Sequence, residues 1–191
     1  MLFRSKSNFP KRRSKCLDKL DFQTFQYEIH ASQLINNEAE LHIGIYSSAI
    51  KNISAWNGWQ PSQWVRFCNL ITKKYPKVHF YLIGAEYDDT TEEIYMKLNN
   101  ATLVQGYHLG VIVELFKRLD NFFAFASGLP IISTMLKCKT LMFYPPKRPD
   151  LFPNLAYSFA RKKDINTHRY IPMIWDSVDN VMKVIEEKNF I

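Results

Sequence analysis

Apolar residues in this chain fall into two alternating kinds of segment. Five short runs lack the polar alternation of a half-exposed strand, which is expected of strands covered on both faces. These runs are 41–46, 78–83, 102–105, 121–126 and 140–144. Most segments between them repeat apolar residues every three or four positions, as helices do. The alternation predicts right-handed βαβ crossovers and therefore a Rossmann-like α/β fold, a parallel sheet with helices on both faces.

The predicted helices have recognisable ends. One begins near Pro61 and stops before Pro76, because proline suits the first turn of a helix and interrupts its interior. Thr90 and Glu93 have the spacing of a capping box, which predicts a helix over 90–100. Further helices are expected over 110–119, from 129 onward and over 176–188.

The other segments are predicted to be irregular. Residues 47–60 are polar and rich in tryptophan and should form an exposed loop, and 145–154 hold four prolines and should be extended. Residues 155–160 fit an edge strand or a short helix. Near the N-terminus, 17–37 is a polar and aromatic mixture that ends in a loop. We therefore divide the chain into a basic, partly ordered N-terminal extension, 1–37, and a Rossmann-like domain, 38–191.

The net charge of +7 belongs almost entirely to the extension. Residues 1–20 contain seven basic residues and one acidic residue, so the remainder is nearly neutral. A basic nucleic-acid-binding surface on the domain is therefore not expected, and nucleic acid is an unlikely class of partner. The extension itself fits a solvated tail, while contact with RNA, an anionic lipid surface or an acidic partner stays open.

Targeting signals and metal motifs are not apparent in the sequence. No apolar stretch follows the basic residues as in a secretory signal, and no run is long enough to span a bilayer. Three cysteines lack C-x-x-C spacing and five histidines lack metal-ligand spacing, so we expect no metal site and a reducing compartment. These features predict a soluble, cytoplasmic protein.

The fourth predicted strand ends in the sharpest turn of the chain. Ser127-Gly128 turns the backbone, and Leu129-Pro130 begins a short helix. Such a turn leaves backbone N–H groups free at the start of a helix, a geometry that suits a phosphate. The same residues are also explained without a ligand, because Gly128 would permit the turn and Ser127 would cap the helix.

Polar residues follow the first two predicted strands as well. Ser47, Ser48 and Lys51 follow the first strand, and Glu86 follows the second. Because ligands of open α/β sheets bind at the carboxyl ends of the strands, these groups should lie near the turn after the fourth strand. Hydroxyls, a lysine and backbone N–H groups suit a diphosphate, and a carboxylate suits ribose. The pattern predicts a nucleotide site, although each residue alone is also explained as an ordinary loop residue.

Four motifs occur in a characteristic order: IGIYSS, WNGWQPSQW, YLIGAEYD and LFKRLDNFFAFASGLPIISTMLKCKTLMFYPP, over about residues 41–146. This order resembles the carboxyl-terminal domain of the ADP-heptose–lipopolysaccharide heptosyltransferase family, which consists of GT-B glycosyltransferases. The resemblance implies a domain that binds a nucleotide-sugar donor as substrate, with no cofactor. It matches Ser47, Ser48 and Lys51 to the donor-phosphate loop, Glu86 to the ribose acid, and Ser127, Gly128 and Leu129 to the diphosphate turn.

The chain also departs from that family. Ala126 and Ile131 occupy positions where the family often has an acid and a histidine. Only about forty residues precede the first strand, so we expect no acceptor domain, which commonly supplies the catalytic carboxylate. The catalytic residues are therefore unknown, and an acceptor-domain partner chain or a second copy is an expected partner.

Two functional hypotheses follow. The chain is either the donor-binding half of an inverting GT-B glycosyltransferase, or a non-catalytic nucleotide or nucleotide-sugar binding module, including a decayed fragment of such an enzyme. Turnover of a sugar donor distinguishes the two.

Overall fold

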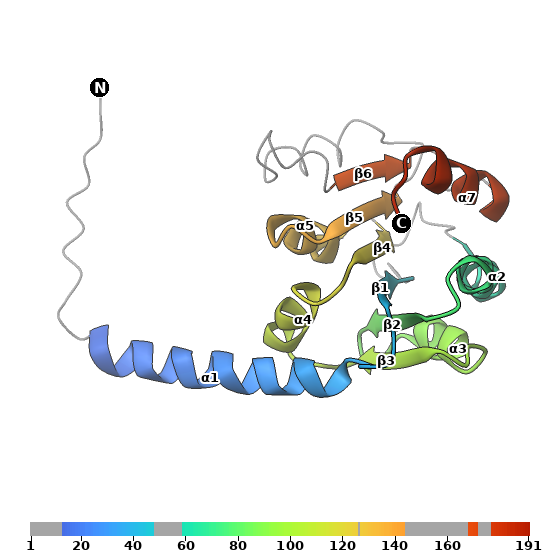
Figure 1. Cartoon of the computed structure of the whole chain (residues 1–191). Helices are drawn as coiled ribbons and strands as arrows, with labels where there is room; N and C mark the ends of the chain where they lie inside the picture. The colour runs from blue at the N-terminus through green and yellow to red at the C-terminus, as the bar shows by residue number, and fades with distance from the viewer. Residues whose placement is uncertain (1–12, 48–58, 126, 144–167, 172–176) are drawn as a thin grey trace, which may run out of the picture.

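Six strands form one parallel sheet, which confirms the predicted α/β fold (Figure 1). The computed structural model describes residues 13–47, 59–125, 127–143, 168–171 and 177–191. The strands are β1 Leu41–Tyr46, β2 Val78–Gly84, β3 Ala101–Gln105, β4 Asn121–Phe125, β5 Lys139–Phe143 and β6 His168–Ile171. The helices are α1 Arg13–Leu34, α2 Pro61–Lys74, α3 Asp89–Tyr95, α4 Leu109–Phe116, α5 Gly128–Met135 and α7 Val178–Glu187. Strand β6 was not predicted, and the segment 155–160 lies outside the described residues.

The strand order is β3-β2-β1-β4-β5-β6, and every neighbouring pair is parallel. The chain adds β2 and β3 on one side of β1 and then crosses to add the remaining strands on the other side. At such a crossing point the loops after the two central strands leave the sheet in opposite directions. Open α/β sheets bind ligands in the crevice at such a crossing point. In this sheet that position lies between the ends of β1 and β4.

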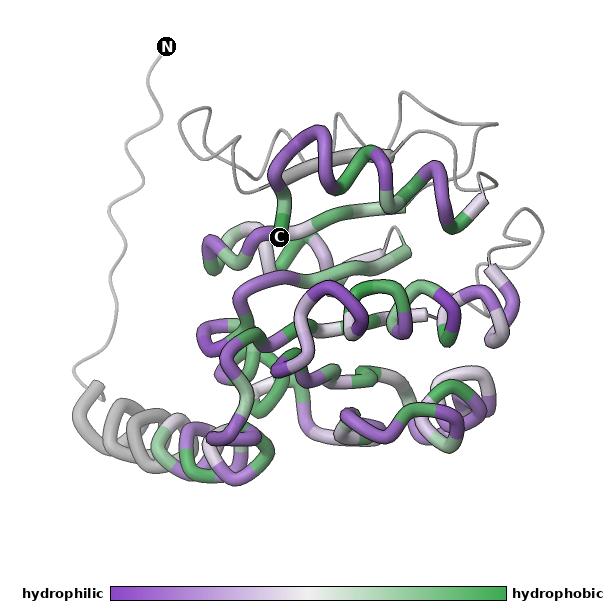
Figure 2. The backbone as a smooth tube through the Cα atoms, turned by 45° about the vertical axis from the view of Figure 1, so that its right-hand side comes forward, coloured by the Kyte–Doolittle hydropathy of each residue, from purple (hydrophilic) through white to green (hydrophobic). Residues whose placement is uncertain are grey.

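Helices cover both faces of the sheet (Figure 1). On one face, α2, α3 and α7 bury a cluster of aromatic rings around Trp64, whose ring centroid lies 5.1 Å from that of Trp59 and 5.6 Å from that of Phe143. On the other face, α1, α4 and α5 cover a second apolar cluster, in which Phe116 and Phe122 pack with centroids 4.7 Å apart. Figure 2 shows apolar and polar segments alternating along these helices.

Trp59 corrects the prediction of an exposed loop over 47–60. Its side chain is only 6% exposed and packs against Trp64, Phe67 and Phe143. Burial of a large aromatic surface is favourable by about 2–3 kcal/mol, which outweighs the polar character of the surrounding sequence. Residues 48–58, the main part of that predicted loop, lie outside the described residues.

Helix α1 was not predicted. Its last turns pack on the domain through Tyr27, Ala31 and Leu34, which are spaced as one helical face, and Ala31 is fully buried. The opposite face carries Phe25 and Ile29, which are exposed. Because apolar residues occur on both faces, the sequence shows no single apolar stripe, and the helical period is hidden.

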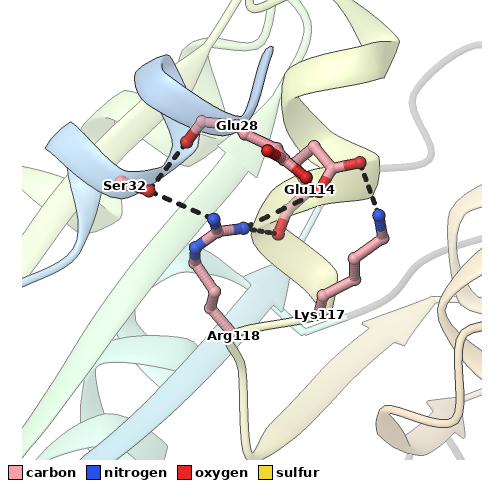
Figure 3. A network of polar contacts seen from close by, with 5 residues as sticks. All are labelled: Glu28, Ser32, Glu114, Lys117 and Arg118. Atoms are coloured by element: carbon pink, nitrogen blue, oxygen red, sulfur yellow. Dashed lines mark hydrogen bonds and ion pairs between the residues drawn. The ribbon is translucent and has the colours of Figure 1, made fainter. Parts of the chain in front are cut away.

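A polar network fixes α1 against α4 (Figure 3). The Arg118 guanidinium donates to Ser32 Oγ at 3.1 Å and to the Glu114 carbonyl at 2.7 Å, and Ser32 in turn donates to the Glu28 carbonyl. The buried carboxylate of Glu114 accepts from Lys117 Nζ at 2.6 Å. Of these contacts, the Arg118–Ser32 hydrogen bond joins the two elements, while Glu114 holds Arg118 in place, and together they help to fix the rotation of α1 about its axis.

The predicted capping box at Thr90 and Glu93 is wrong. Helix α3 begins at Asp89 with Asp88 as its N-cap, and Glu93 pairs instead with Lys97 at 2.6 Å. The helix also ends at Tyr95, five residues earlier than predicted. One physical reason is the side chain of Asn100, whose amide donates to the Val78 carbonyl at 2.9 Å and holds the preceding turn against the start of β2.

Candidate functional site

The carboxyl ends of four strands lie at the same level. Strands β1 and β4 pair as far as Tyr46 and Ala124, and β2 and β3 pair as far as Gly84 and Gln105. The residues that follow these strands therefore emerge together at one edge of the sheet, at the crossing point of the topology. This edge contains Ser47, Glu86 and the Ser127-Gly128 turn, whereas Ser48 and Lys51 lie outside the described residues.

Ser47 is tied to helix α3 by a chain of hydroxyl groups. It is 5% exposed, and its Oγ lies 3.3 Å from Thr91 Oγ1, which donates to Asp88 Oδ2 at 2.9 Å. Since the single hydroxyl hydrogen of Thr91 is used by Asp88, Ser47 must donate to Thr91. In this arrangement the Ser47 side chain holds the end of β1 beside α3, and its hydrogen is not free for a phosphate.

Asp88 is a site residue that the sequence analysis missed. It is 3% exposed, and its Oδ1 has no hydrogen-bond partner within the part of the chain that the structure describes. A buried carboxylate oxygen without a donor is unfavourable, so a ligand hydroxyl placed there would be bound strongly. The sequence signal for Asp88 is its place as the second acid after β2, directly before a helix. The sequence-based prediction names Glu86 because it is the first acid after that strand.

Tyr46 lies beside this carboxylate. Burial raises the pKa of its phenol, and the negative charge of Asp88, followed by that of Tyr87, raises it further. The phenol is therefore neutral near pH 7 and retains its hydrogen as a donor at the end of β1.

Glu86 is exposed and lies over the end of β3. Its side chain contacts Gly106, where a β-carbon would come within 3.1 Å of Oε1 and would collide with the side-chain carbons. Gly106 also has a φ of 72°, a conformation that other residues rarely adopt. The neighbouring Gln105 donates from Nε2 to the Asp88 carbonyl at 3.1 Å. The turn after β2 is thus fitted to the end of β3.

The turn after β4 has room beside Gly128 among the described residues. Ser127 is the N-cap of α5, but its Oγ makes no cap hydrogen bond and is buried without a partner among the described residues. A β-carbon at Gly128 would meet no atom of the described residues within 4 Å, and φ is not positive there. The described backbone at this turn therefore does not require a glycine. The neighbouring Leu129 packs against the apolar cluster of α1 and α4.

A pocket of about 500 Å³ opens between α1 and the end of β3. The ring of Tyr27 stacks on His108 with centroids 4.9 Å apart and planes within 9°, and Tyr107 is 43% exposed. The pocket shares Gly106 with the contact made by Glu86. The residues around it are Tyr27, His30, Gln105, Gly106, Tyr107, His108 and Val111. Sequence analysis did not find this pocket because it depends on α1.

Within the described segments, no group of three or more His, Cys, Asp or Glu side chains is placed to hold a metal ion. None of the helices in the same segments is long and apolar enough to cross a bilayer.

Comparison with solved structures gives the fold. The chain is similar to E. coli ADP-heptose LPS heptosyltransferase II, with a TM-score of 0.64 and 17% identity over 85% of this chain and 51% of that one. It is similar to a glycosyl transferase family 9 protein from Veillonella parvula, with a TM-score of 0.65, 11% identity and coverages of 85% and 51%. It is also similar to E. coli heptosyltransferase WaaC solved with ADP, with a TM-score of 0.62, 12% identity and coverages of 84% and 48%.

The resemblance noted in the sequence is thus confirmed as a heptosyltransferase-like fold, and the chain spans about half the length of these structures. A UDP-GlcNAc 2-epimerase from Neisseria meningitidis bound to UDP-GlcNAc is also similar, with a TM-score of 0.52 and 15% identity over 91% of this chain and 43% of that one. No protein-family model matches the chain. No curated protein sequence matches it either.

Proposed function

We propose that this domain binds a nucleoside diphosphate sugar along the carboxyl edge of its sheet and serves as the donor-binding half of a glycosyltransferase. The observation that carries the proposal is the order of groups along that edge. The start of helix α5 follows β4, with no described atom within 4 Å of a β-carbon built at Gly128; buried and exposed carboxylates follow β2, and an aromatic pocket follows β3. A nucleoside diphosphate presents phosphate, ribose and base in the same order.

The diphosphate is assigned to the start of α5. The first turn of a helix directs N–H groups and the positive end of the helix dipole toward an anion. Among the described residues, nothing lies within 4 Å of a β-carbon built at Gly128, and the buried Ser127 hydroxyl has no partner. Phosphate oxygens would satisfy both groups. We assign Ser48 and Lys51 to the same diphosphate as an expectation from the sequence.

Ribose and base are assigned to the ends of β2 and β3. Glu86 and Asp88 offer carboxylate oxygens, which accept hydrogen bonds from ribose hydroxyls. The pocket beside Gly106 has the volume of a small-ligand site, and its aromatic walls suit a planar base. The Gln105 amide at its rim both donates and accepts, as recognition of a base requires.

The chemistry proposed is transfer with inversion at the anomeric carbon. An acceptor oxygen, deprotonated by a base, attacks that carbon, and the nucleoside diphosphate leaves with the bonding electron pair. N–H groups at the start of α5 would stabilise the charge that develops on the leaving phosphate. The acceptor would be held by a second domain or chain, because positioning of two reactants supplies about 7–11 kcal/mol of a barrier.

Binding without transfer is the second candidate. The domain has the fold of an epimerase solved with UDP-GlcNAc as well as that of the heptosyltransferases. The polar groups along its edge are explained by binding of the nucleotide alone.

Thermal unfolding with a panel of nucleoside diphosphates and nucleotide sugars tests the binding site. Ligand at a hundred times its dissociation constant stabilises a fold by about 2.7 kcal/mol, which is a clear shift in melting temperature. Glu86→Gln should weaken binding, whereas Glu187→Gln, an equally conservative change of an exposed acid on α7, should not. If no nucleotide shifts the melting temperature at millimolar concentration, the proposed site is refuted.

Transfer is tested separately. Incubation of the chain with a bound donor and a panel of glycan acceptors should give little or no multiple turnover unless a second domain is added. Efficient transfer by the chain alone would contradict the half-enzyme proposal, and binding with no transfer under any condition would favour the binding module.

A further inference from the structure

We propose that the amino edge of the sheet, where β1 and β2 begin, holds a pH-sensitive latch for the carboxyl end of helix α1. The latch consists of Asn36, His42, His79 and Tyr81, and it is closed when both histidines are neutral. Protonation of His79 opens it. The inference rests on hydrogen bonds among described residues and does not depend on the proposed nucleotide site.

Asn36 lies two residues beyond the end of α1, and strand β2 holds both its backbone and its side chain. Its backbone N–H donates to the Tyr81 hydroxyl at 3.0 Å, and its side-chain Nδ2 lies 3.1 Å from His79 Nδ1. The other side-chain atom, Oδ1, accepts from the Glu38 N–H at 3.0 Å. Asn36 is therefore a point at which the segment between α1 and β1 is fastened to the sheet.

The bond between Asn36 and His79 requires a neutral ring. An amide Nδ2 can only donate, so His79 Nδ1 must accept and carries no hydrogen. The ring hydrogen is then on Nε2, which donates to Thr102 Oγ1 at 2.8 Å on strand β3. A second proton would have to bind Nδ1, where it would face the Asn36 donor. Since His79 is only 8% exposed, this conflict is relieved by moving Asn36 away.

The bond between Asn36 and Tyr81 depends on the other histidine. Tyr81 is fully buried, and burial raises the pKa of its phenol, so the hydroxyl keeps its hydrogen. Because the phenol oxygen accepts from the Asn36 N–H, its hydrogen is donated to His42 Nδ1, 2.9 Å away. A proton on His42 Nδ1 would displace the Tyr81 hydrogen from this acceptor. Both anchors of Asn36 thus end at a ring nitrogen that must be unprotonated.

The two histidines also oppose each other's protonation. Their rings flank Tyr81, with centroids 5.9 Å from its ring for His42 and 5.2 Å for His79. Burial lowers the pKa of His79, and His42 lowers it further. A proton is therefore bound more readily when the latch is open than when it is closed.

The carboxylates of this edge do not offset that effect. Asp120 Oδ2 accepts from the backbone N–H of His42 at 2.8 Å, and Glu40 pairs with Lys77. Glu38 contributes its backbone N–H to Asn36. Among the described residues, no carboxylate forms an ion pair with either histidine ring, so none stabilises an imidazolium while the latch is closed.

Helix α1 is also attached farther from its end. Ser32 accepts from Arg118, and Tyr27 stacks on His108 (Figure 3). Opening of the latch therefore loosens the carboxyl end of α1 and its connection to β1, while the preceding turns stay on the domain. Because α1 also carries Tyr27 and His30 into the pocket of about 500 Å³, a proton bound at the amino edge acts on an element that forms one wall of that pocket.

Hydrogen exchange of the backbone N–H of residue 36 measures the latch directly, because this group donates to Tyr81. In the full 191-residue chain, its protection factor should fall about threefold to tenfold between pH 7.5 and pH 5.5. The upper limit follows from a single proton and a released ring with a pKa of about 6.5. Low concentrations of urea should leave this protection unchanged but lower that of Phe123, since a local opening exposes little surface.

Two substitutions should change the pH dependence in different ways. Asn36→Asp should reverse it, because the carboxylate accepts from a protonated His79 Nδ1 and raises the pKa of the bound ring, so protection at residue 36 rises as the pH falls. His79→Gln should remove it, because glutamine donates and accepts without titrating. His30→Gln, which changes an exposed histidine of the same helix, is the control and should retain the pH dependence of the parent chain.

Circular dichroism and melting temperature at pH 7.5 establish that each variant is folded. Protection at residue 36 that is equal at both pH values in the parent chain would overturn the proposal, as would an unchanged pH dependence in His79→Gln. Equal protection and equal urea dependence at residue 36 and Phe123 would also overturn it, because the segment would then open only when the whole domain unfolds.

Discussion

The ring of Tyr27 in α1 stacks on His108, the residue that caps α4, with ring centroids 4.9 Å apart and ring planes within 9°. His108 Nδ1 accepts from the Gly110 N–H at 3.1 Å, and the Tyr27 ring lies directly on Gly110. A β-carbon at Gly110 would occupy the space of that ring. Attachment of α1, and with it one wall of the aromatic pocket, therefore depends on a glycine in the first turn of the neighbouring helix.

We expect Gly110→Ala to destabilise the protein although alanine is the better helix former. The new methyl group must displace Tyr27, and overpacking of this kind costs about 1–3 kcal/mol against a gain of about 1 kcal/mol from helix propensity. Gly128→Ala is the control, since its β-carbon meets no described atom within 4 Å and φ is not positive. Urea unfolding should show a loss for the first variant and no loss for the second. Equal stabilities would contradict the packing argument.

Thr91→Val should destabilise the edge of the sheet. Valine has the shape of threonine but removes the hydroxyl that joins Ser47 to Asp88, and it leaves two buried groups without their partner. The expected loss in the free energy of unfolding is about 1–3 kcal/mol. Thr90→Val, which changes a half-buried neighbour in the same helix, should cost only a few tenths of a kcal/mol. Similar losses in the free energy of unfolding for both variants would show that the hydrogen bonds from Ser47 through Thr91 to Asp88 contribute little to stability.

Stability should fall as the pH drops below neutral because of His79. Burial lowers the pKa of this histidine, and the nearby His42 lowers it further. Its Nδ1 accepts from the Asn36 amide at 3.1 Å, since Asn36 Oδ1 is held by the Glu38 N–H, and its Nε2 donates to Thr102. The ring is therefore bound in its neutral form, and a proton on Nδ1 would face a donor.

The direction of this pH dependence follows from the linkage between proton binding and folding. A folded pKa below the unfolded value of about 6.5 means that the unfolded chain binds more protons, so the free energy of unfolding decreases as the pH falls through about 6.5. One proton limits the slope to about 1.4 kcal/mol per pH unit. Urea midpoints measured from pH 8 to pH 5.5 should show this fall, and His79→Gln should flatten it while His30→Gln, at an exposed position, should not. An unchanged slope in His79→Gln would rule out this histidine as the cause.

Helix α7 should be held by its apolar face rather than by its ion pairs. Arg66 binds Asp179 at 2.7 Å, but both side chains are 58% exposed, and such pairs contribute about 0–1 kcal/mol. Ile185 is 3% exposed in the aromatic cluster, where truncation to alanine costs about 2–5 kcal/mol. Denaturant unfolding of Arg66→Ala and Ile185→Ala should show this difference. A loss above 2 kcal/mol for Arg66→Ala would contradict it.

The parallel sheet could be predicted because its strands are buried on both faces. In the strand Asn121–Phe125 every residue is buried, and residues 122–125 are an uninterrupted apolar run in the sequence. Helix α2 was predicted at both ends, since Pro61 begins it and Pro76 follows it. Where a helix has one apolar face and proline boundaries, the local sequence is sufficient to predict both the helix and its ends.

The candidate site could be predicted only in part. Its place at the strand ends follows from the fold class, but the choice of Glu86 over Asp88 depends on which carboxylate turns inward, and that depends on Thr91 and Gly84. The aromatic pocket requires α1, whose two apolar faces conceal its period. The conformation at Gly128 depends on backbone geometry that a glycine does not reveal, because a glycine is compatible with either sign of φ.

Gly128→Val should separate binding from stability at the start of α5. Position 128 is the first residue of the helix, φ is not positive, and no atom of the described residues lies within 4 Å of a β-carbon there. Valine should therefore change the free energy of unfolding by no more than about 1 kcal/mol. If a diphosphate lies against the N–H groups of that turn, the valine side chain occupies its place, and affinity for nucleoside diphosphates should fall at least tenfold. Ser127→Ala should have a smaller effect, because the backbone N–H groups stay in place.

Titration calorimetry with the nucleoside diphosphate that gives the largest thermal shift measures these affinities. Met135→Ala, at the other end of the same helix and 59% exposed, is the control for changes in α5 that do not touch the turn. A Gly128→Val protein that is folded and binds the nucleotide as tightly as the parent chain would place the diphosphate elsewhere on the edge of the sheet. A Gly128→Val protein that does not fold would instead show that this position has a structural role, and Gly128→Ala would then decide whether the empty space holds the ligand.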